Sequence, residues 1–169
     1  KSSLPPEVSL VAVSKTKPVS DLLEAYEAGQ RIFGENKIQE MVSKWEQLPK
    51  DIQWHMIGHV QTNKVKYMAP FVHTIHAVDR IKLLKEIQKQ AEKNERIINC
   101  LIQIRIAEED TKFGLAASEL DAMLEASASC SHVKIKGLMG MATFTSDTDQ
   151  IQTEFQKLAQ LYQKNSEFE

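Results

Sequence analysis

The sequence lacks the features that mark secreted, membrane-spanning and nucleic-acid-binding proteins. It has only two cysteines, Cys100 and Cys130, and they lack the spacing of metal ligands, which favours the reducing cytoplasm over a disulfide framework. No apolar run approaches the roughly 20 residues of a membrane span, and residues 1–6 lack the apolar stretch of a signal peptide. The net charge is −2 with both signs interspersed, so neither nucleic acid nor an anionic membrane is predicted as a partner.

The chain does have the size and hydrophobic content of one domain. Its 169 residues are 42% hydrophobic, which is enough to bury a core, and no linker or low-complexity tract divides them. We therefore expect a single domain over residues 1–169. The chain begins with Lys1 rather than methionine, so we also expect that its front has been trimmed.

Short apolar runs alternate with amphipathic stretches along the whole chain. Strands are predicted at 10–13, 31–34, 51–58, 71–78, 97–106 and 133–142. Helices are predicted at 18–29, 36–45, 62–68, 81–91, 120–124 and 151–162. Six strand-helix units joined by short crossovers predict a parallel sheet in an α/β fold.

The polar residues favour a barrel over an open sheet, because they follow several different strands and no G-x-G-x-x-G or Walker sequence is present. A (β/α)₈ TIM barrel needs eight units, whereas only about six can be counted before Glu169. We therefore expect a barrel that is cut short.

Lys15 follows the first predicted strand, 10–13, which reads as buried on both faces. Burial destabilises the charged form of a lysine and lowers its pKa, and the neutral amine is a nucleophile that forms Schiff bases with carbonyl compounds. The alternative is that the side chain simply extends from the strand end into solvent.

Two further residues at strand ends are candidates for the site. Asn36 follows the second strand and either presents its amide to a ligand or caps the next helix. His55 lies within the third strand and faces either the barrel lumen, as a site residue, or the helices, as a core residue. The histidines without metal-ligand spacing are interpreted as structural, and no metal site is predicted: His59, His73, His76 and His132.

The later strands add a loop and a glycine-rich segment. The loop 110–114 is either a turn or part of a lid over the site. Gly137 and Gly140 bracket the sixth strand, which indicates close packing or the close approach of a flat ligand. Met139 between them belongs either to the core or to a contact with an aromatic ring.

As an ordered set, these motifs resemble the pyridoxal phosphate homeostasis protein family. The resemblance is carried by residues 12–18 (AVSKTKP), 33–36 (FGEN), 54–58 (WHMIG) with Gln61, Asn63 and Lys64, 112–114 (KFG) and 137–141 (GLMGM). It implies a barrel similar to the N-terminal domain of alanine racemase. It also implies that Lys15 holds pyridoxal phosphate (PLP) as a Schiff base, with Asn36, His55 and Met139 lining the site.

The sequence departs from this family at both ends. The family continues into two further strands that supply a Ser-Met-Gly-Met-Ser-like turn and an Arg-Ile-Gly segment for the phosphate, and it has a helix before the first strand. None of these is present. We therefore expect the chain to be truncated at both ends and to bind the aldehyde end of PLP better than its phosphate.

The function that the resemblance implies is PLP homeostasis: a cytoplasmic, monomeric protein that buffers the cofactor, protects it or delivers it to PLP-dependent apoenzymes, with little or no turnover. An amino acid racemase or decarboxylase of the same fold is the alternative, and a cofactor-free Schiff-base aldolase is a third reading. The tyrosines expected on outward-facing helices are not predicted to act as a second base: Tyr26, Tyr67 and Tyr162. Lys17 remains an alternative to Lys15 as the amine that binds the aldehyde, because an extended chain would place both lysines on the same side.

Overall fold

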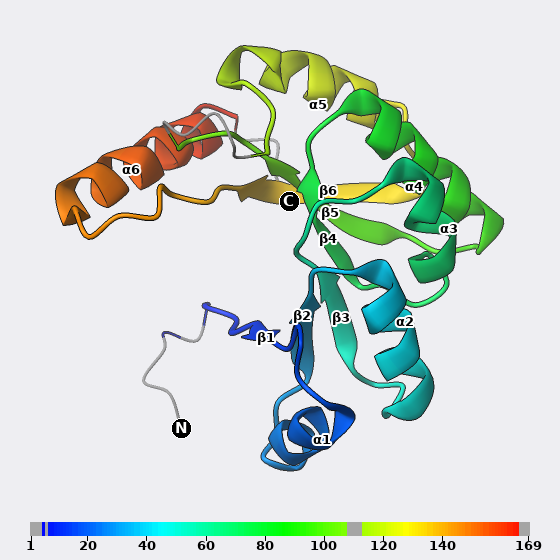
Figure 1. The fold of residues 1–169 in the computed structure, drawn as a ribbon. Coiled ribbons are helices and arrows are strands. Elements are labelled where there is room, and N and C mark those ends of the chain that lie inside the picture. Colours follow the sequence, from blue (N-terminus) through cyan, green and yellow to red (C-terminus); the bar gives the residue numbers. More distant parts are fainter. Residues whose placement is uncertain (1–4, 6, 108–112, 166–169) are drawn as a thin grey trace.

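Six parallel strands in sequential order form one sheet (Figure 1). The structure, a computed structural model, describes residue 5 and residues 7–107 and 113–165. The strands are β1 (Ala12–Val13), β2 (Ile32–Glu35), β3 (Gln53–Met56), β4 (Thr74–Val78), β5 (Ile98–Gln103) and β6 (Val133–Met139). The α-helices are α1 (Val19–Glu27), α2 (Ile38–Gln47), α3 (Val65–Met68), α4 (Ile81–Lys93), α5 (Leu120–Ala128) and α6 (Thr148–Lys164). The 3₁₀ turns η1 (Thr62–Lys64) and η2 (Ala117–Glu119) precede α3 and α5.

The strand-helix alternation predicted from the sequence is confirmed. Figure 1 shows a curved sheet with α2, α3, α4 and α5 along its outer side, which is the layering of a (β/α)₈ barrel. Six βα units are present in the described residues, so the expected barrel is present in part.

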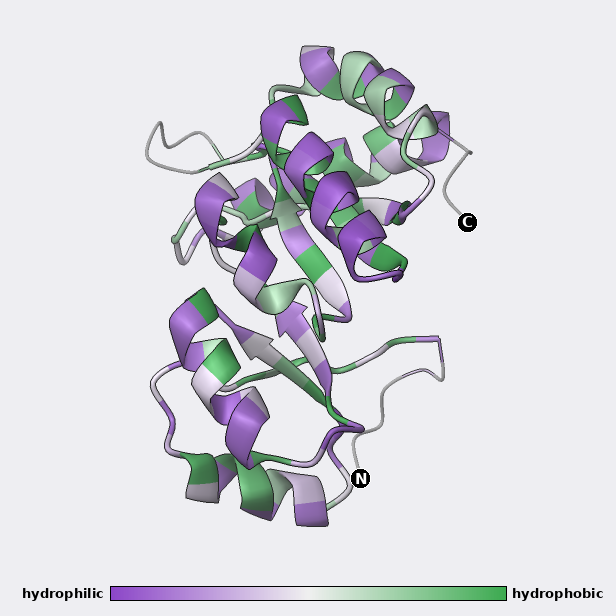
Figure 2. Ribbon diagram, turned by 90° about the vertical axis from the view of Figure 1, so that its right-hand side faces the viewer, coloured by the Kyte–Doolittle hydropathy of each residue, from purple (hydrophilic) through white to green (hydrophobic). Residues whose placement is uncertain are grey.

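One continuous core lies between the sheet and the outer helices. It extends from Leu22 of α1 to Val133 of β6 and includes Trp54 of β3, which is fully buried. Figure 2 shows hydrophobic and hydrophilic residues alternating along the outer helices. In α4 the apolar residues spaced three and four apart are fully buried: Leu83, Leu84, Ile87 and Ala91. No helix in the described part of the chain is long and apolar enough to cross a bilayer.

The prediction that the first strand is buried on both faces is wrong. The strand β1 has two residues and, among the residues that the structure describes, pairs with β2 alone, so it lies at an edge of the described sheet. Leu10 and Val13 are each 55% exposed, and Lys15 is exposed as well. An apolar run is buried on both faces only where packed layers cover both faces, and at this edge of the described sheet Leu10 and Val13 are left uncovered.

Two local predictions near β1 and β2 also need correction. Residues 15 and 16 form a turn in which Thr16 has a φ of 64°, so the chain does not continue extended from Lys15 to Lys17. Asn36 does not cap α2, because the N-cap residue is Lys37, which makes no side-chain capping bond. The amide of Asn36 is therefore not used by the helix.

Candidate functional site

A cavity of about 460 Å³ lies at the carboxyl ends of the strands, where parallel barrels carry their functional residues. Each of the six strands contributes to it, either from its own residues or from the segment beside it. The lining residues that follow or belong to the strand ends include Lys15 (β1), Asn36 (β2), Gly58 (β3), His76 (β4), Gln103 (β5) and Met139 (β6). Three of the four predicted site residues therefore lie together, while His55 is not in the lining.

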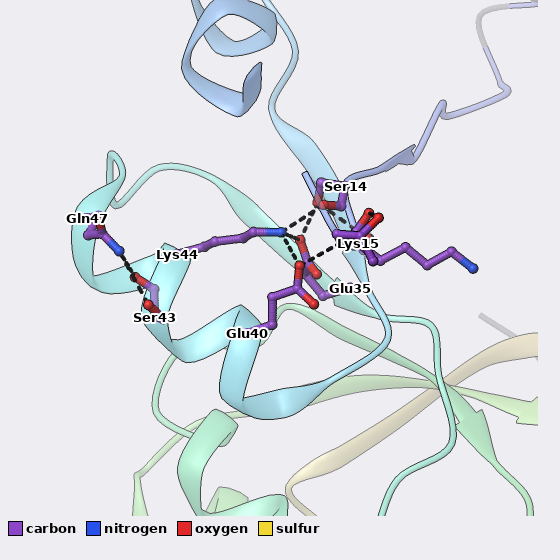
Figure 3. Close-up of polar contacts among 9 residues, drawn as sticks. Ser14, Lys15, Glu35, Glu40, Ser43, Lys44 and Gln47 are labelled. Carbon is purple, nitrogen blue, oxygen red and sulfur yellow. Dashed lines mark hydrogen bonds and ion pairs between the residues drawn. The ribbon is translucent and has the colours of Figure 1, made fainter. Parts of the chain in front are cut away.

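Lys15 reaches the cavity from the turn after β1. Figure 3 shows its side chain extending away from α2, with the amine at the far end. No hydrogen bond or ion pair joins its Nζ to another residue in the described part of the chain. Lys17 lines a different depression, of about 420 Å³, together with Glu40 and Lys44.

Gly58 fixes the position of Asn36. A Cβ atom at residue 58 would lie 2.5 Å from the carbonyl oxygen of Asn36 and 2.7 Å from its Cα. Only glycine lets the segment after β3 approach the segment after β2 this closely. The sequence showed Gly58 as the end of a strand but gave no signal of this contact, because the partner lies on another strand.

His55 stands behind the cavity wall and contacts it through His76. The His55 Nδ1 and His76 Nε2 atoms are 2.8 Å apart, and the His55 ring stacks on His73 with 5.4 Å between centroids. Burial lowers the pKa of His55 to about 3 and the pKa of His76 to about 4, from an ordinary value of 6.5. Both rings are therefore neutral at neutral pH.

The sequence reasoning missed His76 as a lining residue and interpreted it as structural. Strand alternation contains a signal that points to it. His55 pairs with Thr74 in the parallel register of β3 and β4, so His76, two residues after Thr74, lies on the same face of the sheet as His55. The strand boundaries had to be known before this signal could be used.

The loop before η2 contributes Phe113 to the cavity. Its ring stacks on His59 with centroids 4.2 Å apart, and its carbonyl oxygen accepts a hydrogen bond of 3.0 Å from Gln103 Nε2. Gln103 is buried at the end of β5, so this bond joins the loop to the end of that strand. The preceding loop residues, including Lys112 of the predicted motif, lie outside the described residues.

The wall composition suits a flat aromatic ring with a polar edge. Val11, Val13, Ile57, Met139 and Met141 provide apolar surface, and the same lining includes an amine, two amides and two imidazoles. A primary amine beside such a surface can condense with a carbonyl group of the ring's substituents.

The residues after β3 shape a neighbouring depression of about 310 Å³. It shares Asn36 and His59 with the main cavity and adds Gln61 and Lys64, two residues of the predicted motif. Among the described residues, no group of three or more His, Cys, Asp or Glu side chains is arranged to hold a metal ion.

The chain is similar to a well-defined group of proteins. The family model "Alanine racemase, N-terminal domain" matches residues 1–168. A pyridoxal phosphate homeostasis protein of Aquifex aeolicus is 38% identical over 153 residues, covering 90% of this chain and 67% of the relative. One of Vibrio alginolyticus is 38% identical over 164 residues, covering 94% and 70%. The chain thus spans about two thirds of the length of these curated relatives.

Solved structures agree with this similarity. PipY of Synechococcus elongatus, solved with PLP bound, superposes with a TM-score of 0.88 at 32% identity, covering 96% of this chain and 76% of PipY. An alanine racemase of Clostridium difficile superposes with a TM-score of 0.78 at 10% identity, covering 96% of this chain and 44% of the racemase. At that identity the racemase shows the shared fold alone.

Proposed function

Because the chain belongs to the pyridoxal phosphate homeostasis protein family, which carries the alanine racemase N-terminal domain, we propose that it binds PLP in the cavity at the strand ends. The observation that carries this proposal is that one cavity of about 460 Å³ brings together Lys15, Asn36 and Met139, which lie far apart in the sequence. Its apolar wall and polar margin fit the pyridine ring of PLP.

Lys15 is the residue that holds the cofactor. Its Nζ is a primary amine, which would hold PLP by condensing with the aldehyde with loss of one water. The bound cofactor supplies an electron sink for substrates that carry an amine. Lys17 is the weaker candidate, because it lines the depression beside Glu40 and Lys44 rather than this cavity.

The remaining predicted site residues orient the ring. Asn36 offers its amide at the cavity margin, and Met139 offers its thioether to the ring. His55 acts indirectly. Its ring holds the ring of His76, which lines the cavity as a neutral group.

The cavity supports a carrier rather than an enzyme with strong turnover. No tyrosine lines it in the described part of the chain, and Tyr26, which the structure pairs with Asp51 at 2.8 Å, is used elsewhere. His76, with its pKa lowered to about 4, is a poor proton donor at neutral pH. We expect a cytoplasmic monomer that buffers PLP and passes it to PLP-dependent apoenzymes.

Borohydride reduction of the PLP-loaded protein, followed by peptide mass mapping, tests the role of Lys15. We expect the reduced pyridoxyl group on Lys15. Lys15→Ala should lose the visible absorption of the protein-bound imine, whereas Lys17→Ala, the matched control, should retain it. Label on Lys17 alone, or on neither lysine, would contradict the proposal.

Incubation with single amino acids separates the carrier from a racemase or decarboxylase. The PLP-loaded protein should leave the optical activity and the concentration of each amino acid unchanged over many cofactor equivalents. Sustained exchange or loss of the amino acid would overturn the carrier function while leaving PLP binding intact.

A further inference from the structure

Lys44 of α2 places its amine in a buried polar network behind the turn that carries Lys15 (Figure 3). Its side chain is only 6% exposed. The Nζ atom lies 2.7 Å from each of three acceptors: the carbonyl oxygen of Ser14 and the carboxylates of Glu35 and Glu40. A lysine ammonium has three N–H donors, so the three acceptors use all of them. This amine is held in place by the three acceptors.

The network contacts the residues on both sides of Lys15. On one side, Ser14 accepts the bond from Lys44 at its carbonyl oxygen and donates from its Oγ to Glu35 Oε1 at 2.6 Å. On the other side, the backbone N–H of Thr16 donates to Glu40 Oε1 at 2.7 Å. Groups from β2 and α2 therefore fix both neighbours of Lys15.

The turn between them has a conformation that needs this support. Thr16 has a φ of 64°, which is an outlier for a β-branched residue and persists only where surrounding contacts impose it. The turn's own bond runs from the Lys17 N–H to the Ser14 carbonyl oxygen at 3.1 Å, and the bond from the Thr16 N–H to Glu40 ties the turn to α2. The hydrogen bond from Lys44 lowers the pKa of Glu40, so that carboxylate stays ionised and the bond it accepts is charge-assisted.

The turn separates two lysines that an extended chain would place on one side. Lys15 lines the cavity at the strand ends, whereas Lys17 lines the depression that also contains Glu40 and Lys44. Figure 3 shows the Lys15 side chain running away from the amine of Lys44. The direction of the turn thus determines which amine faces the cavity.

We propose that Lys44, Glu35 and Glu40 are positioning residues that hold the turn at Thr16 and thereby direct Lys15, rather than Lys17, to the aldehyde of PLP. The inference rests on the proposed role of Lys15 as the amine that binds PLP. It adds a structural reason why one of two lysines that are two residues apart reacts with the aldehyde.

Glu40→Gln is the test variant, because its amide oxygen still accepts a hydrogen bond while the charge is lost. Glu46→Gln, the same change at an exposed position of the same helix, is the control. Two quantities are measured on PLP addition: the rate at which the imine absorption appears, and the partition of borohydride-trapped label between Lys15 and Lys17. We expect Glu40→Gln to react roughly tenfold more slowly, since small misplacements of a reacting group cost rate steeply. We also expect part of its label on Lys17.

The partition of the label distinguishes positioning from a merely structural role, since a general loss of stability would not move label between two lysines of a folded protein. A folded Glu40→Gln variant with the rate and label pattern of Glu46→Gln would overturn the inference. Lys44→Met is the second variant and should shift label in the same direction. Lys44→Met leaves Glu35 buried without a cation, which can prevent folding. In that case the result for Glu40→Gln alone tests the inference. If the borohydride-trapped label of the wild-type protein is not found on Lys15, both the proposed role of Lys15 and this inference are overturned.

Discussion

Two lysines near the start of the sheet show how position decides the role of a side chain. Lys15 follows a strand that was predicted to be buried, and its side chain was predicted either to be buried with that strand or to extend into solvent; it is exposed beside a cavity. Lys44, in the middle of an amphipathic helix, is buried in a network of carboxylates. The sequence indicates neither environment, because both depend on which strands and helices cover the residue. Reasoning from strand ends nevertheless predicted that Lys15, Asn36 and Met139 would lie together, and they line one cavity.

The residues that sequence reasoning missed share one property: their partners are distant in the chain. His76 belongs to the site through its register with β3, and Gln103 belongs to it through the carbonyl group of Phe113. Glu40 acts through the backbone of Thr16, 24 residues away. Strand and helix periodicity indicates which residues share a face, but it does not indicate which faces meet.

Gly58→Ala should distort the site by adding a single atom, the Cβ. The added Cβ would lie 2.5 Å from the carbonyl oxygen of Asn36, so one of the two segments must move. We expect a loss of about 1–3 kcal/mol in the free energy of unfolding and weaker PLP binding, measured by urea unfolding and by cofactor titration.

Gly29→Ala provides the comparison for this variant. Gly29 has a φ of 101° at the end of α1, so alanine there is strained by about 1 kcal/mol or more. It is not in the cavity lining, and PLP affinity should not change. Equal losses of affinity in the two variants would show that binding follows stability rather than the position of Asn36.

At the scale of elements, β3 and β4 each contribute a buried histidine that makes stability depend on pH. His55 and His76 face each other across the two strands, and burial holds their pKa values at about 3 and about 4. In the unfolded chain both histidines take up protons as the pH falls through about 6.5. The native state does not, so it is most stable above pH 6.5 and loses stability as the pH falls towards 4.

We therefore expect the free energy of unfolding to fall between pH 6.5 and pH 4, by at most about 1.4 kcal/mol per pH unit for each histidine. Urea unfolding at several pH values measures this slope. His55→Gln removes one of the two groups and should make the slope shallower. An unchanged slope in that variant would place the source of the pH dependence elsewhere in the protein.

The elements also differ in how fully they were predicted. The positions of α4 and of β3 to β5 followed from apolar spacing, because these elements are covered by neighbours and their buried faces match the pattern. The strand β1 did not, because an edge strand exposes the same apolar residues that a central strand buries. The turn at Thr16 also escaped prediction, since its N–H donates a hydrogen bond to Glu40 of α2, a partner that the local sequence does not indicate.

At the scale of the whole molecule, the continuous core predicts one cooperative unfolding transition, as expected for a single domain. Trp54 is buried in β3 and Trp45 of α2 stacks on Phe71 with centroids 4.4 Å apart, so tryptophan fluorescence reports this half of the sheet. Far-ultraviolet circular dichroism reports all helices, including α5 and α6. The two signals should give the same midpoint, and separate midpoints would divide the chain into two units.

Bound PLP should shift that transition as a whole. A ligand that binds only the native state stabilises it by about 2.7 kcal/mol at a concentration of 100 times its dissociation constant. Both signals should move together to higher urea. Lys15→Ala should show a smaller shift, because the ring can still enter the cavity but cannot be held covalently.

The volume of the cavity has a consequence for selectivity among amines. The aldehyde of PLP condenses with any accessible lysine, and this chain carries many of them on its surface. One cofactor confined with Lys15 in about 460 Å³ experiences that amine at an effective concentration of roughly 4 M, the reciprocal of the volume. Lysines that meet PLP only by diffusion compete at their bulk concentration. Confinement would therefore keep the aldehyde from modifying other amines, which is the protection that a carrier of a reactive cofactor must provide.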